Sequence, residues 1–158
     1  MKIRLYQPKD APQLVRLLHE FLKYTQTHYS EQTKWFTQAI KSKEKAYVQD
    51  YVRRFTRKKK SRLLLAEENG KVIAYILGSI QTNNFERDKI RGYVDSIFVS
   101  KDFRDRKLGK QLYLELTAWL KERGCKQLIL EVAEGNPAID IYEKWGFKRT
   151  RQEMRKRL

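Results

Sequence analysis

The sequence predicts a single α/β domain in which a mixed, partly antiparallel sheet is flanked by helices. Strand and helix patterns follow one another in the order β-α-α-β-β-β-α-β-α-β, with room for one further strand at the end. An Asn-Gly pair between two apolar runs indicates a hairpin inside this series. Since no repeat or low-complexity linker divides residues 1–158, we expect one domain.

The first part of the chain predicts a strand and two helices. Residues 2–6 alternate as a strand does, and Asp10 then resembles an N-cap whose capping box is completed by Gln13. A second, weaker helix is expected over about residues 33–55. The first helix rests on apolar residues at helical spacing, namely Leu14, Leu17, Leu18, Phe21 and Leu22.

The second part predicts a hairpin, a further strand and a strand between two helices. Residues 63–67 and 72–81 form the hairpin, and residues 93–99 form the next strand. A helix covers 108–120 and stops at Gly124, and a strand follows over 128–132. Asn136 then caps a helix that begins with Pro137 and ends at Gly146. The tail from Phe147 is expected to be extended.

Composition limits the class of protein. The chain is 41% hydrophobic with seven Gly and three Pro, which fits a globular domain with a sizeable core. A single cysteine, Cys125, excludes an internal disulfide and a thiolate-rich metal site. His19 and His28 lack metal-ligand spacing, so no metal is expected. The N-terminus lacks a signal peptide and no run could span a bilayer, so we expect a cytoplasmic protein that makes no use of membranes.

Positive charge is concentrated in three segments. Residues 53–62, 101–110 and 148–158 together carry +15 of the net charge of +16. A local positive potential of this kind attracts an anionic ligand, although solvated basic loops without a partner are the simpler alternative.

The basic segment before the helix at 108–120 predicts an anion site. Here a strand ends in a short loop that leads directly into a helix, whose free N–H groups and dipole suit a pyrophosphate. Gly109 would let the ligand approach the backbone. An ordinary solvated loop would show the same pattern. The candidate binding residues are Arg104, Arg106, Lys107, Leu108, Gly109 and Lys110.

Two motifs together resemble the GNAT superfamily of acyl-CoA-dependent N-acetyltransferases. The family's phosphate motif is Gln/Arg-x-x-Gly-x-Gly/Ala, which Arg104 and Gly109 match at its two ends while Lys107 replaces the middle glycine. Its later motif, Asn-x-x-Ala followed by Tyr and Gly-Phe, is matched less closely. That match comprises Asn136, Ala138 beside Ile139, Tyr142, Gly146 and Phe147.

The resemblance implies the activity and the role of several residues. It implies transfer of an acetyl group from acetyl-CoA to a primary amine, by direct attack in a ternary complex. Tyr142 would supply a proton or hydrogen bond to the leaving sulfur, although alone it would pass for a core aromatic. Backbone groups of the strand that includes Ile97 and Val99 would pair with the pantetheine arm. Asn136 would help to hold that arm, although helix capping alone would explain this residue.

The resemblance and strand geometry together single out Asp95 as the base that accepts or relays the proton of the amine. Period-2 alternation places it on the face of Ile97 and Val99, where an apolar setting would raise its pKa. Glu131 on the neighbouring strand is a weaker candidate. Alternatively, Asp95 ends the substrate loop or binds a substrate cation.

The departure at Lys107 carries a cost if this position needs a positive φ. A lysine would then cost about 1–2 kcal/mol relative to glycine, offset in part by pairing of its ammonium with phosphate.

The acceptor amine and the partners are less determined. Aromatic residues of the first two helices suit a flat or amphipathic amine, and the basic run 53–62 would favour an acidic acceptor if it bordered the site. The rival hypothesis is a basic module that binds nucleic acid or the ribosome and has no catalysis, with residues 53–62 and 148–158 as its footprint. Pairing of the C-terminal strand would also allow a homodimer.

Overall fold

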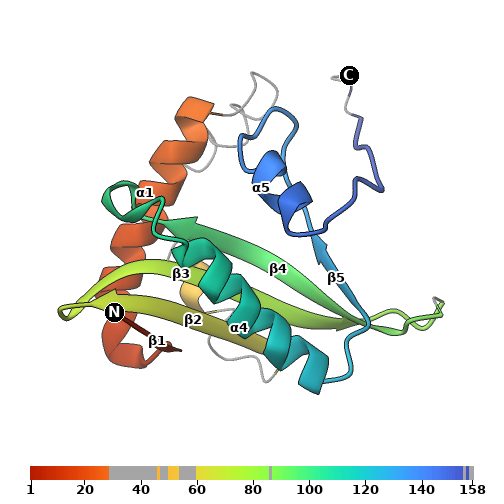
Figure 1. Ribbon diagram of the computed structural model, residues 1–158, viewed down its shortest axis with the longest axis horizontal. Helices are drawn as coiled ribbons and strands as arrows, with labels where there is room; N and C mark the ends of the chain where they lie inside the picture. Colours follow the sequence, from red (N-terminus) through yellow and green to blue (C-terminus); the bar gives the residue numbers. More distant parts are fainter. Residues whose placement is uncertain (29–45, 47–49, 54–59, 86, 155, 157–158) are drawn as a thin grey trace.

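The computed structural model describes residues 1–28, 46, 50–53, 60–85, 87–154 and 156. Its sheet has five strands in the order β1-β2-β3-β4-β5, of which the first four are antiparallel while β5 pairs parallel to β4. This architecture confirms the predicted fold class (Figure 1). The strands are β1 (Lys2–Leu5), β2 (Ser61–Glu68), β3 (Lys71–Thr82), β4 (Ile90–Val99) and β5 (Gln127–Leu130). The helices are α1 (Ala11–His28), α4 (Leu108–Glu122) and α5 (Ile139–Lys144), with 3-10 turns at Pro8–Asp10 and Lys101–Phe103.

The β2–β3 hairpin confirms the prediction from the Asn-Gly pair. Asn69 and Gly70 have φ values of 50° and 77°, the left-handed conformation that two-residue hairpin turns require. The side chain of Gln13 holds this turn, donating to Gly70 O at 3.2 Å and accepting from Val72 N at 2.8 Å. The predicted capping box between Asp10 and Gln13 is therefore wrong, because the Gln13 amide is committed to the hairpin.

Asp10 instead belongs to a buried ionic cluster at the start of the chain. Its carboxylate accepts from the Arg4 guanidinium at 2.6 and 2.9 Å and from Gln7 N at 2.8 Å. Arg4 also donates to Glu67 at 2.7 Å, which ties β1 to β2. The hydrogen bond from Arg4 lowers the pKa of Asp10 although burial opposes this shift.

Two apolar cores cover the two faces of the sheet. The α1 stripe packs on one face with side chains such as Leu65, Tyr75 and Phe98. The α4 stripe packs on the other face, where Leu112, Leu116 and Leu120 are buried against the middle strands. Figure 1 shows α4 and α1 on opposite sides of the sheet. Since both stripes were predicted from helical spacing, the core follows from the sequence pattern.

β5 runs beside only the first half of β4. They pair from Arg91↔Gln127 to Val94↔Leu130, after which β5 ends and β4 continues to Val99. At this point a β-bulge leaves Asp95 out of the ladder with β3, because Leu77 pairs with Ser96 and Gly78 with Val94. A bulge bends its strand and re-aims the side chains that follow. The two parallel strands therefore part at Asp95.

Two predicted elements are not observed or lie mostly outside the described residues. The described tail residues 147–154 and 156 form no strand, so the extended final strand is not observed. Residues 148–154 are exposed and mostly polar or charged, so they offer no apolar face that a strand could bury. Most of the helix predicted over residues 33–55 lies outside the described residues. Within that range the structure describes residues 46 and 50–53, which are helical. None of the described helices combines the length and apolarity that a membrane crossing needs.

Candidate active site

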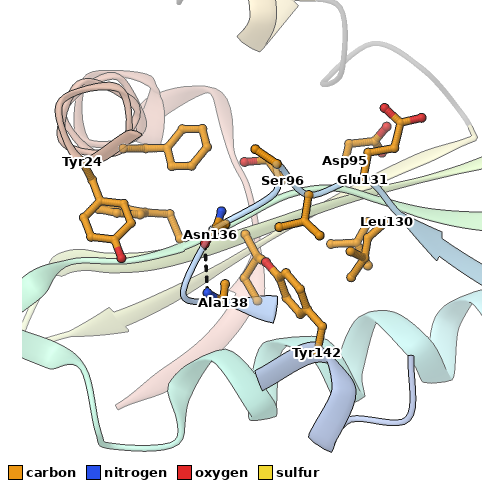
Figure 2. Close-up of a pocket in the computed structure, with 14 residues that line it drawn as sticks. Tyr24, Asp95, Ser96, Leu130, Glu131, Asn136, Ala138 and Tyr142 are labelled. Carbon is orange, nitrogen blue, oxygen red and sulfur yellow. Dashed lines mark hydrogen bonds between the residues drawn. The ribbon is translucent and has the colours of Figure 1, made fainter. Parts of the chain in front are cut away.

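A pocket of about 180 Å³ opens where β4 and β5 separate. Its floor comes from the residues that follow the last pair of the β4–β5 ladder, and its walls come from α1 and from the segment around α5 (Figure 2). The lining residues are Phe21, Tyr24, Val94, Asp95, Ser96, Ile97, Phe98, Leu130, Glu131, Val132, Ala133, Asn136, Ala138 and Tyr142. The pocket thus unites residues from four elements that are far apart in sequence.

Asp95 and Glu131 both line this pocket, and both are exposed. Figure 2 shows the two carboxylates pointing to the same side of the pocket, away from the ring of Tyr142. The expectation that Asp95 shares an apolar face with Ile97 and Val99, and is desolvated there, is wrong. The bulge is the reason, because it shifts the alternation so that Val94 and Ile97 both pack against the core under α4.

The ring of Tyr142 projects into the pocket from α5 (Figure 2). It is half-buried and lies edge-on to Trp145, with ring centroids 5.8 Å apart, and to Phe147 at 6.1 Å. Gly146 has a φ of 95°, which ends the helix and lets Phe147 N donate to Tyr142 O at 3.1 Å. The Trp-Gly-Phe turn therefore fixes the direction in which the phenol points.

Asn136 lines the same pocket and forms the turn that precedes α5. Its Oδ1 accepts from Ala138 N at 2.9 Å, and its carbonyl accepts from Ile139 N at 3.0 Å. The predicted cap is wrong in its position, because α5 begins at Ile139 with Ala138 as its N-cap and no side-chain capping bond. The bond from Ala138 N to Asn136 Oδ1 instead closes a turn over residues 137–138, ahead of the helix. Its role toward a pantetheine arm stays a prediction.

The loop before α4 has the backbone of an anion site. Lys107 has φ 59° and ψ 14°, and Asp105 has φ 63°, so both are left-handed. The first helical bond recorded at this end runs from Gln111 N to Lys107 O at 3.1 Å. In the described part of the chain, the amides of residues 105–110 donate to no acceptor. A row of free amides at a helix start is where a pyrophosphate binds best.

Gly109 and Ile97 connect this loop to the pocket. A Cβ built on Gly109 would lie 3.7 Å from Trp145, 3.8 Å from Val99 and 3.9 Å from Ile97, which are ordinary contacts. The packing around Gly109 would thus tolerate a side chain, so close approach of a ligand remains a physical reason for glycine. Ile97 itself lines the pocket, which places the amide row beside it.

The basic side chains of the loop point in different directions. Arg104 lies over the ring of Tyr24, with Cζ 4.4 Å from the centroid, and donates from Nε to Val99 O at 3.3 Å. Arg106 instead turns toward the β2–β3 hairpin, where it pairs with Glu68 at 3.3 Å. The structure therefore brings Arg104, but not Arg106, to the pocket wall.

The side chains of the remaining predicted binding residues make packing contacts within the fold. Lys110 Nζ lies over the rings of Tyr113 and Trp145 at 5.2 and 5.4 Å. Leu108 is a buried core residue, so its main chain is the part that could contact a ligand. Val99 is partly buried against the same core and does not line the pocket.

The pocket wall contributed by α1 agrees in part with the sequence, because Tyr24 is one of the aromatic residues of the first two helices that were expected to face the acceptor. Periodicity predicts Phe21 only as part of the helix core, and packing places it at the pocket. Ser96 lies beside these two residues, with its hydroxyl 2.9 Å from that of Tyr75. The bulge is not predicted by the sequence. The one signal for the bulge is the polar pair of Asp95 and Ser96 inside an otherwise apolar strand.

The residues that the structure describes contain no group of three or more His, Cys, Asp or Glu residues placed to hold a metal ion. Cys125 is buried, and desolvation raises the pKa of its thiol, which disfavours the reactive thiolate.

The fold and the site define a class of protein. A parallel strand pair that separates at a bulge, an amide row at the start of the intervening helix and a phenol in the gap suit a group-transfer protein with a diphosphate-bearing donor. The residues at 19–147 match the family model of the Acetyltransferase (GNAT) family. The chain belongs to this family, which confirms the resemblance seen in its motifs.

Individual relatives are moderately similar. N-alpha-acetyltransferase 30 of Dictyostelium discoideum is 35% identical over 92 residues, and glucosamine 6-phosphate N-acetyltransferase of Trypanosoma brucei brucei is 26% identical over 89. These matches cover 58% and 56% of this chain, but 48% and 59% of the relatives, so the chain spans about half the length of the curated relatives it matches.

The fold is also that of solved acetyltransferase structures. Aminoglycoside N-acetyltransferase AAC(6')-Iy, crystallised in complex with CoA, superposes with a TM-score of 0.72 over 99% of this chain and 98% of its own. The sequence identity is 17%, so this likeness concerns the fold alone.

Proposed function

We propose that this protein transfers an acetyl group from acetyl-CoA to a primary amine, by direct attack of the amine in a ternary complex. The single observation that carries the proposal is the adjacency of the free amide row at 105–110 to a pocket that contains Tyr142. A donor whose diphosphate binds these amides can extend its thioester along β4 into the gap between β4 and β5.

The donor would be held by main chain and by few side chains. The amides of the α4 start receive the diphosphate, with Arg104 and Lys107 as the nearest cations of the loop. Free main-chain groups of β4 beyond Val94 are available to the pantetheine amides, because β5 has already ended there. CoA in the complex of the structural neighbour supports this choice of donor.

The amine must lose a proton before or during attack. For an amine with a pKa near ~10.4, deprotonation at pH 7 costs about 4.6 kcal/mol. Among the described residues that line the pocket, Asp95 and Glu131 carry carboxylates. We propose that Asp95 accepts the proton of the amine, directly or through water. Because Asp95 is exposed, the relay through water is the route that its position favours.

Tyr142 would act on the leaving group. As the C–N bond forms and the C–S bond breaks, negative charge develops on the sulfur of CoA. Full proton transfer from a phenol with pKa near ~10 to a thiolate near ~8.5 is uphill by about 2 kcal/mol. Tyr142 therefore stabilises the developing thiolate by a hydrogen bond, and the products are the N-acetyl amine and CoA.

The lining of the pocket favours a cationic acceptor. The fourteen lining residues include two carboxylates and no basic side chain, and the guanidinium of Arg104 at the pocket wall lies against the ring of Tyr24. The acidic acceptor suggested by the run 53–62 finds no support here, since residues 54–59 lie outside the description and neither Lys60 nor Arg62 lines the pocket. An ammonium group would be attracted to Asp95 and Glu131 before it is deprotonated.

The proposal is tested by binding and then by turnover. Acetyl-CoA and free CoA should raise the melting temperature of the protein, while ATP at equal concentration should raise it less. Release of free thiol from acetyl-CoA should then depend on an added amine, with a panel that contrasts spermidine and an aminoglycoside with acidic amino acids. Absence of acetyl-CoA binding at millimolar concentration in a calorimetric titration would refute the proposal.

A further inference from the structure

Basic side chains gather at the end of the sheet opposite the β2–β3 hairpin. The start of β2, the β3–β4 loop and the end of α4 meet there, as Figure 1 shows. Backbone bonds confirm the proximity, since Ile80 N donates to Lys60 O at 2.8 Å and Lys126 N donates to Ile90 O at 3.4 Å. We call this surface the basic pole. It comprises Lys60, Arg62, Arg87, Lys89, Lys121, Arg123 and Lys126.

The positive charge of the basic pole is only partly compensated. The same three sequence segments contain the acidic residues Glu86, Asp88 and Glu122, against seven basic ones. Asp88 accepts a hydrogen bond from the neutral amide of Gln127 at 3.1 Å. Neither Arg62 nor Arg123 pairs with an acid in the described ranges, and Arg62 Nε is inaccessible without an acceptor.

One aromatic ring, the indole of Trp119, contacts two of these guanidinium groups. Arg62 and Arg123 both lie against the indole of Trp119, with Cζ 5.5 and 5.8 Å from its centroid. Trp119 is nearly buried, so the ring is a fixed support for both cations. The exposed guanidinium of Arg123 can still offer its edge N–H groups to a bidentate partner such as phosphate, whereas Arg62 can offer only its terminal nitrogens because its Nε is enclosed.

Phe85 adds an exposed aromatic ring to this surface. It is fully exposed in the β3–β4 loop, where its N–H donates to the side chain of Asn83 at 3.1 Å. Burial does not explain an aromatic ring in this position. An exposed ring beside a positively charged groove or face is the arrangement on which nucleic-acid bases stack.

We propose that the basic pole binds a single-stranded nucleic acid, with phosphates on the arginines and a base stacked on Phe85. A membrane-binding surface would expose several large apolar side chains, whereas those exposed at this pole are Phe85 and, at 40%, Ile90. No residue of the basic pole lines the pocket, so this binding is separate from acetyl transfer. It goes beyond the proposed function and does not depend on it.

The test is fluorescence anisotropy with a labelled 12-nucleotide oligouridylate at 50–200 mM salt. The charge variant is Arg87→Gln with Arg123→Gln, and the stacking variant is Phe85→Ala; all three side chains are exposed, so both variants should fold. The matched control is Lys2→Gln with Lys9→Gln, two exposed lysines at the other end of the sheet that remove the same charge.

The expected results differ between the three proteins. The charge variant should lower the slope of log K against log salt by about 1.4, because two phosphate contacts are lost. Phe85→Ala should weaken binding about five-fold or more, and the control should bind as the unmodified protein does. Equal losses in the control, no binding at 50 mM salt, or binding to phosphatidylserine vesicles without binding to the oligonucleotide would overturn the proposal.

Discussion

The guanidinium of Arg104 lies over the ring of Tyr24, with its Cζ 4.4 Å from the ring centroid. Arg104 belongs to the loop before α4, while Tyr24 belongs to α1 and lines the pocket. A side chain of the candidate diphosphate loop is thus in direct contact with the wall of the candidate acceptor pocket. Cation–π contacts of this kind contribute about 0.5–2 kcal/mol, enough to fix the loop against α1.

Arg104→Gln should raise the KM for acetyl-CoA about ten-fold, because the loss removes both a cation for the diphosphate and the contact with Tyr24. The matched control is Arg106→Gln, two residues away, which pairs with Glu68 and should change the KM less than two-fold. Steady-state kinetics with varied acetyl-CoA measures both. Equal effects at the two positions would show that only the overall charge of the loop matters.

Tyr142→Phe should lower kcat about 100-fold and leave the affinity for acetyl-CoA nearly unchanged, since the hydroxyl acts on charge that develops during the reaction. Tyr113→Phe is the control, because Tyr113 stacks on Trp145 in the same aromatic cluster but does not line the pocket. Thiol release and calorimetry provide the two readouts. An unchanged kcat for Tyr142→Phe would assign this residue to the core.

Asp95→Asn should lower kcat/KM most strongly near pH 7 and less at high pH, where more of the amine is already unprotonated. Glu131→Gln, on the neighbouring segment of the same pocket, should have the smaller effect. The measurement is kcat/KM of both variants against pH with one amine, which shows whether Asp95 or Glu131 is the base. If Glu131→Gln gives the larger loss, the base is on the β5 side of the pocket.

Lys107→Gly should increase the free energy of unfolding by about 1 kcal/mol, because Lys107 has a left-handed φ of 59° that glycine adopts without strain. Lys107→Ala keeps the strained backbone and removes the ammonium, so it should lack this gain. Chemical denaturation gives the stabilities. If both variants also bind acetyl-CoA more weakly, the ammonium contributes to diphosphate binding.

Asp10→Asn should destabilise the fold by about 3 kcal/mol, because Asp10 is buried in contact with Arg4, whose charge would lose its principal partner. The lowered pKa of Asp10 stabilises the fold above its unfolded-state pKa near ~3.9, and this contribution is lost as pH falls through the lower folded-state value. Urea denaturation between pH 2 and 7 should therefore show a shallower acid loss in the variant. Parallel curves would contradict this account.

The sequence by itself determined most of the described elements and indicated the family. Helical spacing gave α1 and α4, Asn69-Gly70 gave the β2–β3 turn, and the segments around Lys107 and Tyr142 indicated the family. These features are local, since spacing, turn residues and caps act within a few residues of the chain. Local physical rules were therefore sufficient for them.

Tertiary structure decided how these parts meet. The bulge at Asp95 depends on the ladder between β3 and β4, and it moved that carboxylate from an expected apolar face to an exposed position. The Gln13 amide bonds the hairpin instead of a helix end, and Arg104 and Arg106 diverge despite their adjacency. Each of these outcomes depends on partners distant in sequence, which spacing along one chain segment cannot specify.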